Sequence, residues 1–183
     1  MSASSHFIRR IPEGEDRERL TCAECGYIAY ENPKIVTGSV VSVDGRILLC
    51  RRAINPRAGF WTIPAGYMEL GETVEEAAKR EAREEACAEL ALDGILAVYS
   101  IARIGQVQVL FRATLARPGF AAGAESLEVR LFSWDEIPWE DLAFPSVHWV
   151  LKAWREAGQG PLGAPRTNPP EDLRGIRPLA EGV

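Results

Sequence analysis

Several features are missing from this chain of 183 residues, and each absence excludes a class of protein. No run of apolar residues approaches the length of about 20 that a helix needs to cross a bilayer, so we expect no membrane partner. The first ten residues have no apolar core of a signal peptide, and the cytoplasm is therefore the expected location. Internal repeats and long low-complexity stretches are also lacking.

A basic charge balance is absent as well, because the net charge is −5. Proteins that coat nucleic acid need an excess of Lys and Arg, so we expect no nucleic-acid partner. The acidic residues are concentrated: between Glu69 and Glu85, seven Glu stand against Lys79, Arg80 and Arg83. This cluster is either a solvated helix face or a site where a divalent cation meets an anionic substrate.

The composition is that of a soluble globular protein, with 46% apolar and 26% charged residues. The length allows one domain with a substantial core and short extensions. We predict a polar N-terminal arm over residues 1–32, a central domain over 33–157 and a Gly/Pro-rich tail over 158–183. The tail is either disordered or wrapped on the surface.

Hydrophobic patterning predicts strands mixed with two helices, which indicates an α/β layered domain. Asp44-Gly45 is a strong hairpin signal between two β-branched segments. Thr73, with Glu76 three residues later, forms a capping box at the start of an Ala/Glu/Arg-rich helix that extends to about Ala88. The strands are predicted at 34–43, 47–50, 60–63, 95–101, 106–115 and 127–134, and the second helix at 146–156.

The first helix places three carboxylates on one face. At about 100° per residue, Glu81, Glu84 and Glu85 share an arc of about 100°. Such close like charges repel strongly unless a cation lies among them. Carboxylate oxygens suit Mg²⁺ or Mn²⁺, and the absence of His or Cys beside them disfavours zinc. The alternative is a surface helix whose Glu side chains pair with neighbouring Lys and Arg.

A glycine-containing loop, residues 66–71, leads into this helix. Gly66 would let backbone groups approach a metal or a phosphate closely. Glu72, at the junction of loop and helix, either holds Arg80 or helps to bind metal, and the spacing alone does not separate these roles.

The same residues resemble the Nudix signature, a Gly followed by Glu, Arg-Glu and Glu-Glu at fixed intervals. The match runs through Gly66, Glu72, Arg80-Glu81 and Glu84-Glu85. It departs at Cys87, where the family has Gly, and at Ala88, where the family has a larger aliphatic residue. Both departures follow the last expected metal ligand, so we expect them to affect packing at the end of the helix rather than chemistry.

The resemblance implies a fold, a metal site and a reaction. The fold would be an α/β/α sandwich with a mixed β-sheet, preceded by a ribbon-like arm. Mg²⁺ or Mn²⁺ would be held by Glu81, Glu84 and Glu85, with Gly66 and Glu72 close by, and water would attack a phosphorus of a diphosphate. The residues implied as catalytic are Glu84, Glu85, Arg80 and a general base.

The general base of this family is often a Glu on a late loop. Glu125 is our first candidate and Glu128 the second, and the alternative for Glu125 is an ordinary exposed loop carboxylate. Residues that would contact the substrate are Arg51, Arg52, Arg57 and Arg112, for charge on the phosphoryl groups, and Phe60. Aromatic candidates for a base or flavin ring, each with a core role as the alternative, are Phe60, Tyr67, Trp134, Trp139 and Phe144.

The N-terminal arm contains a Cys-x-x-Cys motif at Cys22 and Cys25. The arm resembles the four-cysteine ribbon of a Nudix group that hydrolyses FAD or ADP-ribose, but the first Cys-x-x-Cys pair of that group is missing. Structural zinc needs four ligands, so we expect a degenerate ribbon without zinc; a site shared between two chains is the alternative. A homodimer is compatible with an arm that has little core of its own.

Further similarities to the FAD/ADP-ribose group lie at residues 32–36, 48–52, 125–128 and 142–146. They imply a small-molecule nucleotide substrate, FAD or ADP-ribose, cleaved to AMP and the other half. Two alternatives are a Nudix-fold sensor that binds a nucleotide without cleaving it and a sanitiser of oxidised nucleoside triphosphates. The sensor is disfavoured because such proteins typically lose carboxylates of the signature, whereas this chain retains them.

Overall fold

The structure, a computed structural model, describes residues 6–175. The chain divides between Pro33 and Lys34 into two compact units. No helix in the described part of the chain is long and apolar enough to span a membrane.

The first unit is a small antiparallel sheet with strand order β1-β2-β3. The Cys-x-x-Cys motif forms the turn between β2 and β3, where Gly26 N–H donates to the Cys22 carbonyl (3.0 Å) and Cys22 N–H to the Tyr27 carbonyl (2.8 Å). The ribbon-like form expected for the arm is therefore present. The strands are β1 (Phe7–Arg10), β2 (Arg19–Cys22) and β3 (Ile28–Ala29).

The second unit is built on a mixed sheet with strand order β10-β5-β4-β9-β8, in which β6 pairs with β5 and β7 with β4. The pairing of β4 with β9 is parallel and the others are antiparallel. The strands are β4 (Lys34–Val43), β5 (Arg46–Arg52), β6 (Trp61–Thr62), β7 (Ala65–Tyr67), β8 (Leu90–Ile101), β9 (Gln106–Leu115) and β10 (Ser126–Phe132).

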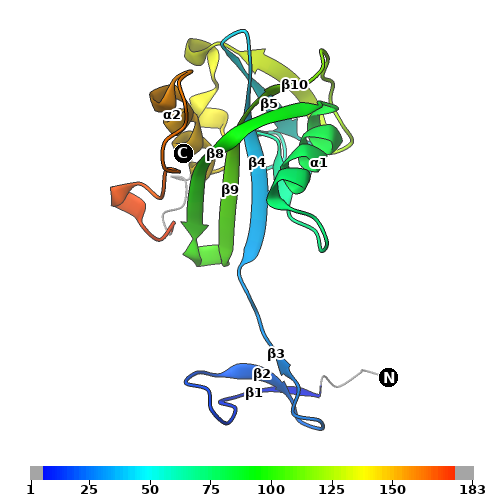
Figure 1. The fold of residues 1–183 in the computed structure, drawn as a ribbon. Helices are drawn as coiled ribbons and strands as arrows, with labels where there is room; N and C mark the ends of the chain where they lie inside the picture. Colours follow the sequence, from blue (N-terminus) through cyan, green and yellow to red (C-terminus); the bar gives the residue numbers. More distant parts are fainter. Residues whose placement is uncertain (1–5, 176–183) are drawn as a thin grey trace. The chain divides into compact units, whose positions relative to one another are not determined.

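The two α-helices, α1 (Val74–Ala86) and α2 (Pro145–Ala157), cover opposite faces of this sheet (Figure 1). Alternating side chains of a strand point to opposite faces. Val40 accordingly belongs to the cluster that contains α2 residues, and Val41 to the cluster that contains Ala82 and Ala86 of α1. The chain thus has the predicted α/β fold. Short 3₁₀ helices occur at Ala102–Ile104 (η1), Trp134–Glu136 (η2), Trp139–Asp141 (η3) and Pro170–Asp172 (η4).

The predicted strands 34–43 and 106–115 are found with the same bounds. The prediction was too short for β8, which begins at Leu90 rather than at residue 95. Asp93-Gly94 resembles a strand end in the sequence, but here it lies at an irregularity in the pairing with β9. The glycine loop after Pro64 also begins as a strand, β7, because its backbone pairs with β4.

The segment after α2 wraps on the surface along β8, the edge strand of the sheet, and residues 158–175 are called the C-terminal strap below. Arg166 exchanges two backbone hydrogen bonds with β8, of 2.8 and 2.9 Å. The Asn168 side chain accepts from Ser100 N–H (2.8 Å) and donates to the Ser100 carbonyl (2.9 Å). The strap therefore covers backbone groups that an edge strand would leave unpaired. Residues 176–183 of the predicted tail lie outside the described residues.

Helix α1 has the predicted capping box, with Thr73 and Glu76 bonded reciprocally. At its other end Cys87 adopts the left-handed conformation (φ 49°) and is exposed. The Gly that the signature has at this position adopts that conformation without a Cβ clash. The departure at Cys87 therefore bears on the backbone at the end of the helix, whereas Ala88, the second departure, is buried in the cluster that contains Ala82 and Ala86.

Replacing Cys87 with Gly is expected to stabilise the protein by about 0.5–1 kcal/mol, because relief of the left-handed cost of about 1–2 kcal/mol exceeds the entropic cost of Gly of about 0.5–1 kcal/mol. Urea unfolding followed by circular dichroism measures the change. Cys87→Ala is the matched control, since Ala loses the thiol and keeps the Cβ. An equal gain in both variants would show that the thiol, not the backbone, is responsible.

Candidate active site

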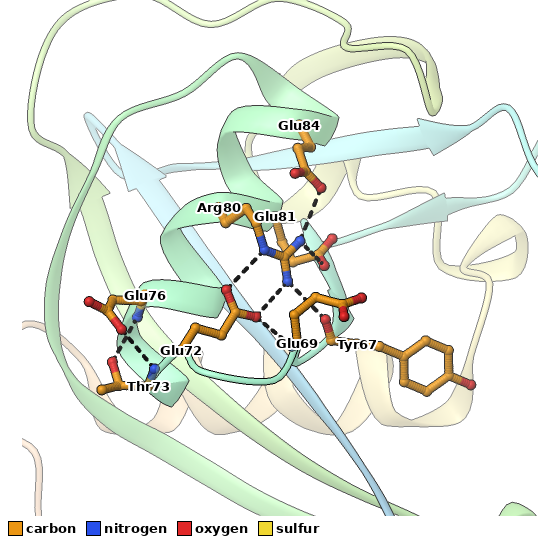
Figure 2. A network of polar contacts seen from close by, with 8 residues as sticks. All are labelled: Tyr67, Glu69, Glu72, Thr73, Glu76, Arg80, Glu81 and Glu84. Atoms are coloured by element: carbon orange, nitrogen blue, oxygen red, sulfur yellow. Dashed lines mark hydrogen bonds and ion pairs between the residues drawn. The ribbon is translucent and has the colours of Figure 1, made fainter.

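Arg80, in the middle of α1, is the centre of a polar network that joins the helix to the loop before it (Figure 2). Its Nε and Nη2 donate to both carboxylate oxygens of Glu72, at 3.0 and 2.8 Å. Its Nη1 donates to Glu81 (2.7 Å) and to Glu84 (3.0 Å), and Nη2 also reaches the Tyr67 carbonyl. The hydrogen bonds from Arg80 lower the pKa of Glu72 to about 2. In this structure Glu72 therefore holds Arg80, the first of the two roles left open by the sequence.

Two carboxylates of α1 are buried, Glu81 within this network and Glu85 next to it in the helix sequence but outside the bonds of Arg80. Glu85 is 4% exposed, and its Oε2 accepts a hydrogen bond from Ala65 N–H at 2.9 Å. Burial raises the pKa of Glu85 to about 8, and the charge of Glu81 adds to the effect. Burial likewise raises the pKa of Glu81, which is 7% exposed. Negative charge at this position is therefore costly unless a cation offsets it.

Gly66 lies directly against the Glu81 carboxylate. A Cβ built on Gly66 would overlap the carboxylate carbon and both oxygens of Glu81. The absence of a side chain at residue 66 thus lets strand β7 approach the buried end of α1. The signature therefore has Gly at this position for a steric reason, since a residue without a side chain leaves room for the Glu81 carboxylate.

The loop before β10 brings Glu125 to the same cavity as these carboxylates. Ala121 N–H donates to the Ala86 carbonyl (2.9 Å) and Gly123 N–H to the Glu85 carbonyl (3.0 Å), so the loop is attached to the last turn of α1. The charge of Glu125 contributes to the raised pKa of Glu81 and of Glu85. Glu128, the second candidate base, lies on β10, forms an ion pair with Arg130 and does not line the cavity.

The cavity has a volume of about 510 Å³ and extends from the carboxylates across β4 and β9 to the end of β8. Its lining combines acidic groups at one end with amide and apolar side chains at the other. The residues at the carboxylate end are Gly66, Arg80, Glu81, Glu84, Glu85 and Glu125. A cavity of this size is sufficient for a nucleotide-sized ligand.

Of the five residues predicted to contact the substrate, Arg52 alone lines this cavity. Its guanidinium lies over the Phe144 ring, at 5.3 Å from the centroid, and Nε donates to the Pro56 carbonyl. The structure places the other four elsewhere. Arg51 bonds to the Gly59 carbonyl, Arg57 lies over the Phe60 ring, and Arg112 pairs with Asp93 and with carbonyls of the strap.

The aromatic residues predicted to contact a base or flavin ring also divide into some that line the cavity and some that do not. Tyr67 and Phe144 line the cavity, whereas Trp134 and Trp139 pack on each other, with ring centroids 5.0 Å apart. The cavity is also lined by four residues that were not predicted as site residues, Trp149, Arg103, Gln106 and Gln108. The alternation Gln-Val-Gln-Val at 106–109 contained a signal, since it places both Gln on one face of a strand, but it is equally typical of a solvent-facing strand.

The carboxylate end fits a hard divalent cation in its chemistry. Glu81, Glu84 and Glu85 offer oxygen ligands, and two of them are buried at a cost that a cation would offset. Among residues 6–175, no three His, Cys, Asp or Glu are already drawn together as a metal centre. Glu81 and Glu84 bond instead to Arg80, and Glu85 bonds to a backbone N–H.

The N-terminal ribbon does not fit zinc within one chain. Residues 1–33 contain two cysteines and one histidine, fewer than the four ligands of a structural zinc site. His6 pairs with Glu24 at 2.9 Å. Hydrogen bonds from the backbone of Cys25 and of Glu24 lower the pKa of the Cys22 thiol. The turn thus makes Cys22 easier to deprotonate than a free thiol, but one chain supplies only two thiols.

Comparison with known proteins identifies both units. Residues 33–155 match the NUDIX domain family, and residues 5–31 match the zinc-ribbon family described as Nudix N-terminal. A crystal structure of a NUDIX hydrolase from Nitrosomonas europaea is 46% identical, with a TM-score of 0.81, and the match covers 88% of this chain and 91% of that one.

Two curated relatives match over shorter stretches. An ADP-ribose pyrophosphatase of Methanocaldococcus jannaschii is 31% identical over 116 residues, which are 61% of this chain and 69% of the relative. An NAD-capped RNA hydrolase NudC of Haemophilus influenzae is 39% identical over 80 residues, which are 42% of this chain and 30% of that protein. The match of the NUDIX domain to most of the chain, on a fold with the carboxylate helix in place, shows that the chain belongs to the Nudix hydrolase family.

Proposed function

We propose that the protein hydrolyses the diphosphate bond of a nucleoside diphosphate-linked substrate, FAD or ADP-ribose, in a Mg²⁺- or Mn²⁺-dependent reaction that releases AMP and the other half. The observation that carries the proposal is the cavity whose one end is lined by Glu81, Glu84, Glu85 and Glu125. The similarity to a relative named ADP-ribose pyrophosphatase supports ADP-ribose as the first substrate to test.

The chain's own residues have separate roles in this proposal. Glu81, Glu84 and Glu85 would hold the cation, which when bound would polarise a phosphoryl oxygen and favour attack by water. Glu72 keeps Arg80 in place, and Arg80 keeps positive charge beside Glu81 and Glu84. Arg52 adds positive charge to the cavity wall.

Glu125 is the proposed general base. It lines the cavity and lies on a loop that is bonded to α1, so it can accept a proton from the attacking water without belonging to the carboxylate triad of the helix. Released AMP carries one phosphate and the other product carries the second, as expected for cleavage within the diphosphate.

A hydrolysis screen of the full chain tests the proposal. The substrates are ADP-ribose, FAD, NADH, diadenosine polyphosphates, coenzyme A and oxidised dGTP, each with Mg²⁺ or Mn²⁺ and with EDTA. We expect AMP release from ADP-ribose or FAD, and its loss with EDTA. Cleavage of oxidised dGTP alone would support the sanitiser, and binding without cleavage of any substrate would support the sensor.

Cation binding is expected to stabilise the protein even without substrate. At a Mg²⁺ concentration about tenfold above Kd, the stabilisation is about 1.4 kcal/mol. For a protein of this size, that corresponds to a rise in Tm of about 3–6 °C. Differential scanning fluorimetry of the wild type and of Glu85→Gln measures it. Equal shifts in both proteins would place the cation somewhere other than at Glu85.

A further inference from the structure

The end of the cavity away from the carboxylates is formed by adjacent strands. Tyr67 of β7 lies opposite Val36 of β4, which lies opposite Gln108 of β9, and all three line the cavity. Gln106, on the same strand, lies opposite Ile101 of β8, and both line the cavity. Three strand spacings of about 4.8 Å separate β7 from β8, so the cavity floor extends about 14 Å from the strand that carries Gly66. This is about the reach from a diphosphate across a ribose to its base.

Two amides form the polar part of this end. Gln106 and Gln108 are half-buried, and Gln106 Nε2 donates to the Tyr67 hydroxyl at 2.9 Å. Gln108 Nε2 donates to Gln106 Oε1 at 3.4 Å. This chain of bonds leaves Gln108 Oε1 as an acceptor and one N–H of the same amide as a donor. A carboxamide with both groups free pairs with the edge of a nucleobase.

Apolar side chains surround the amides. Ile101, Ile104 and Trp149 line the same end of the cavity, and the Trp149 ring packs edge-on against Tyr99, with centroids 5.4 Å apart. A planar group with a polar edge fits such a setting, because its faces meet apolar surface while its edge meets the amide.

The C-terminal strap supports this end from behind. Gly175 lines the cavity at φ +59°, and a Cβ there would lie 2.7 Å from the Ser100 carbonyl oxygen and 2.9 Å from Ile101 Cα. Ala102 N–H donates to the Arg174 carbonyl at 2.9 Å. The strap thus fixes the turn that carries Ile101 and Arg103. It also lies beyond residues 33–155, the part that matches the NUDIX family.

We propose that Gln106, Gln108, Ile101, Ile104 and Trp149 form a nucleobase subsite whose shape depends on the C-terminal strap. Gln108 recognises the hydrogen-bonding edge of the base, and Asn168 is a positioning residue that acts through Ser100 and the end of β8. The inference deepens the proposed function and rests on it, because it assigns the nucleoside half of the substrate to this end of the cavity.

Equilibrium binding to the full chain, measured by isothermal titration calorimetry, tests the subsite. The probes are AMP and ribose 5-phosphate, which differ by the base and contain no diphosphate to cleave. We expect the wild type to bind AMP at least about tenfold more tightly. Gln108→Met, which has nearly the same shape, should weaken AMP binding about fivefold to tenfold through lost hydrogen bonds and leave ribose 5-phosphate unchanged.

Asn168→Ala should also lower the affinity for AMP relative to the affinity for ribose 5-phosphate. General loss of structure would instead weaken the binding of both probes. Asn32→Leu, which also replaces an amide by an apolar group of similar shape, is the matched control, since Asn32 is exposed and lies outside both this cavity and the strap, and its ratio should equal that of the wild type. An unchanged ratio in Gln108→Met, or a wild type that binds both probes equally, overturns the subsite. If the wild type prefers AMP to ribose 5-phosphate as expected but cleaves no diphosphate substrate, the subsite is supported and the proposed hydrolase function is contradicted.

Discussion

Glu85→Gln is expected to reduce turnover at least about a hundredfold and to leave the fold intact. Loss of one group that supports charge in the transition state typically costs a factor of about 10²–10³. The Gln side chain keeps an oxygen that can accept the hydrogen bond from Ala65 N–H, so the position of strand β7 is retained. Because Glu85 is 4% exposed, the substitution also removes a carboxylate whose burial is unfavourable. The cation-free variant should therefore unfold at the same urea concentration as the wild type or at a higher one.

Steady-state hydrolysis of whichever substrate the screen identifies measures the loss, and Glu84→Gln should behave in the same way. Glu75→Gln is the matched control, because Glu75 lies on the same helix, is exposed and does not line the cavity. It should retain wild-type activity. Undiminished activity in both Glu84→Gln and Glu85→Gln would refute the assignment of these side chains to the cation.

The carboxylate helix could be predicted because its determinants are local. Thr73 and Glu76 define the start of α1, and the regular rise of a helix then places Glu81, Glu84 and Glu85 on one side without any knowledge of the sheet. The glycine at 66 followed from the same short motif. The structure added the steric reason, which is that the Glu81 carboxylate occupies the space of a missing side chain.

The far end of the cavity could not be predicted, because it depends on pairings between distant segments. Gln108 approaches Tyr67 only through the parallel pairing of β4 with β9. Arg112 carried a charge suitable for phosphate, but it pairs with Asp93 and with the strap, and no local pattern indicates that contact. A Gly/Pro-rich composition likewise did not reveal that Asn168 would bind Ser100 at the sheet edge.

Gly123→Ala is expected to lower turnover by displacing Glu125 while every carboxylate of α1 remains. A Cβ on Gly123 would overlap the Glu84 carbonyl, a backbone group that cannot swing aside. The loop must then lift from the end of α1, which breaks the hydrogen bond from Gly123 N–H to the Glu85 carbonyl. A general base contributes a factor of about 10²–10⁴, so a loss of roughly a hundredfold in kcat is expected. Overpacking of this kind costs about 1–3 kcal/mol of stability.

Gly163→Ala is the control for Gly123→Ala, since a Cβ on Gly163 meets no atom within 4 Å. Glu125→Gln, which removes the base but not the loop contact, separates the two parts of the explanation. If Glu125 is the base, both variants lose kcat, yet both retain the Mg²⁺-dependent rise in Tm, because the carboxylates on the helix are unchanged. A Glu125→Gln protein with full activity, beside an inactive Gly123→Ala, would instead mean that the loop acts by holding Glu84 and Glu85 in position. The close contact of Gly123 with the end of α1 would then be needed to position the cation ligands Glu84 and Glu85 rather than to position a base.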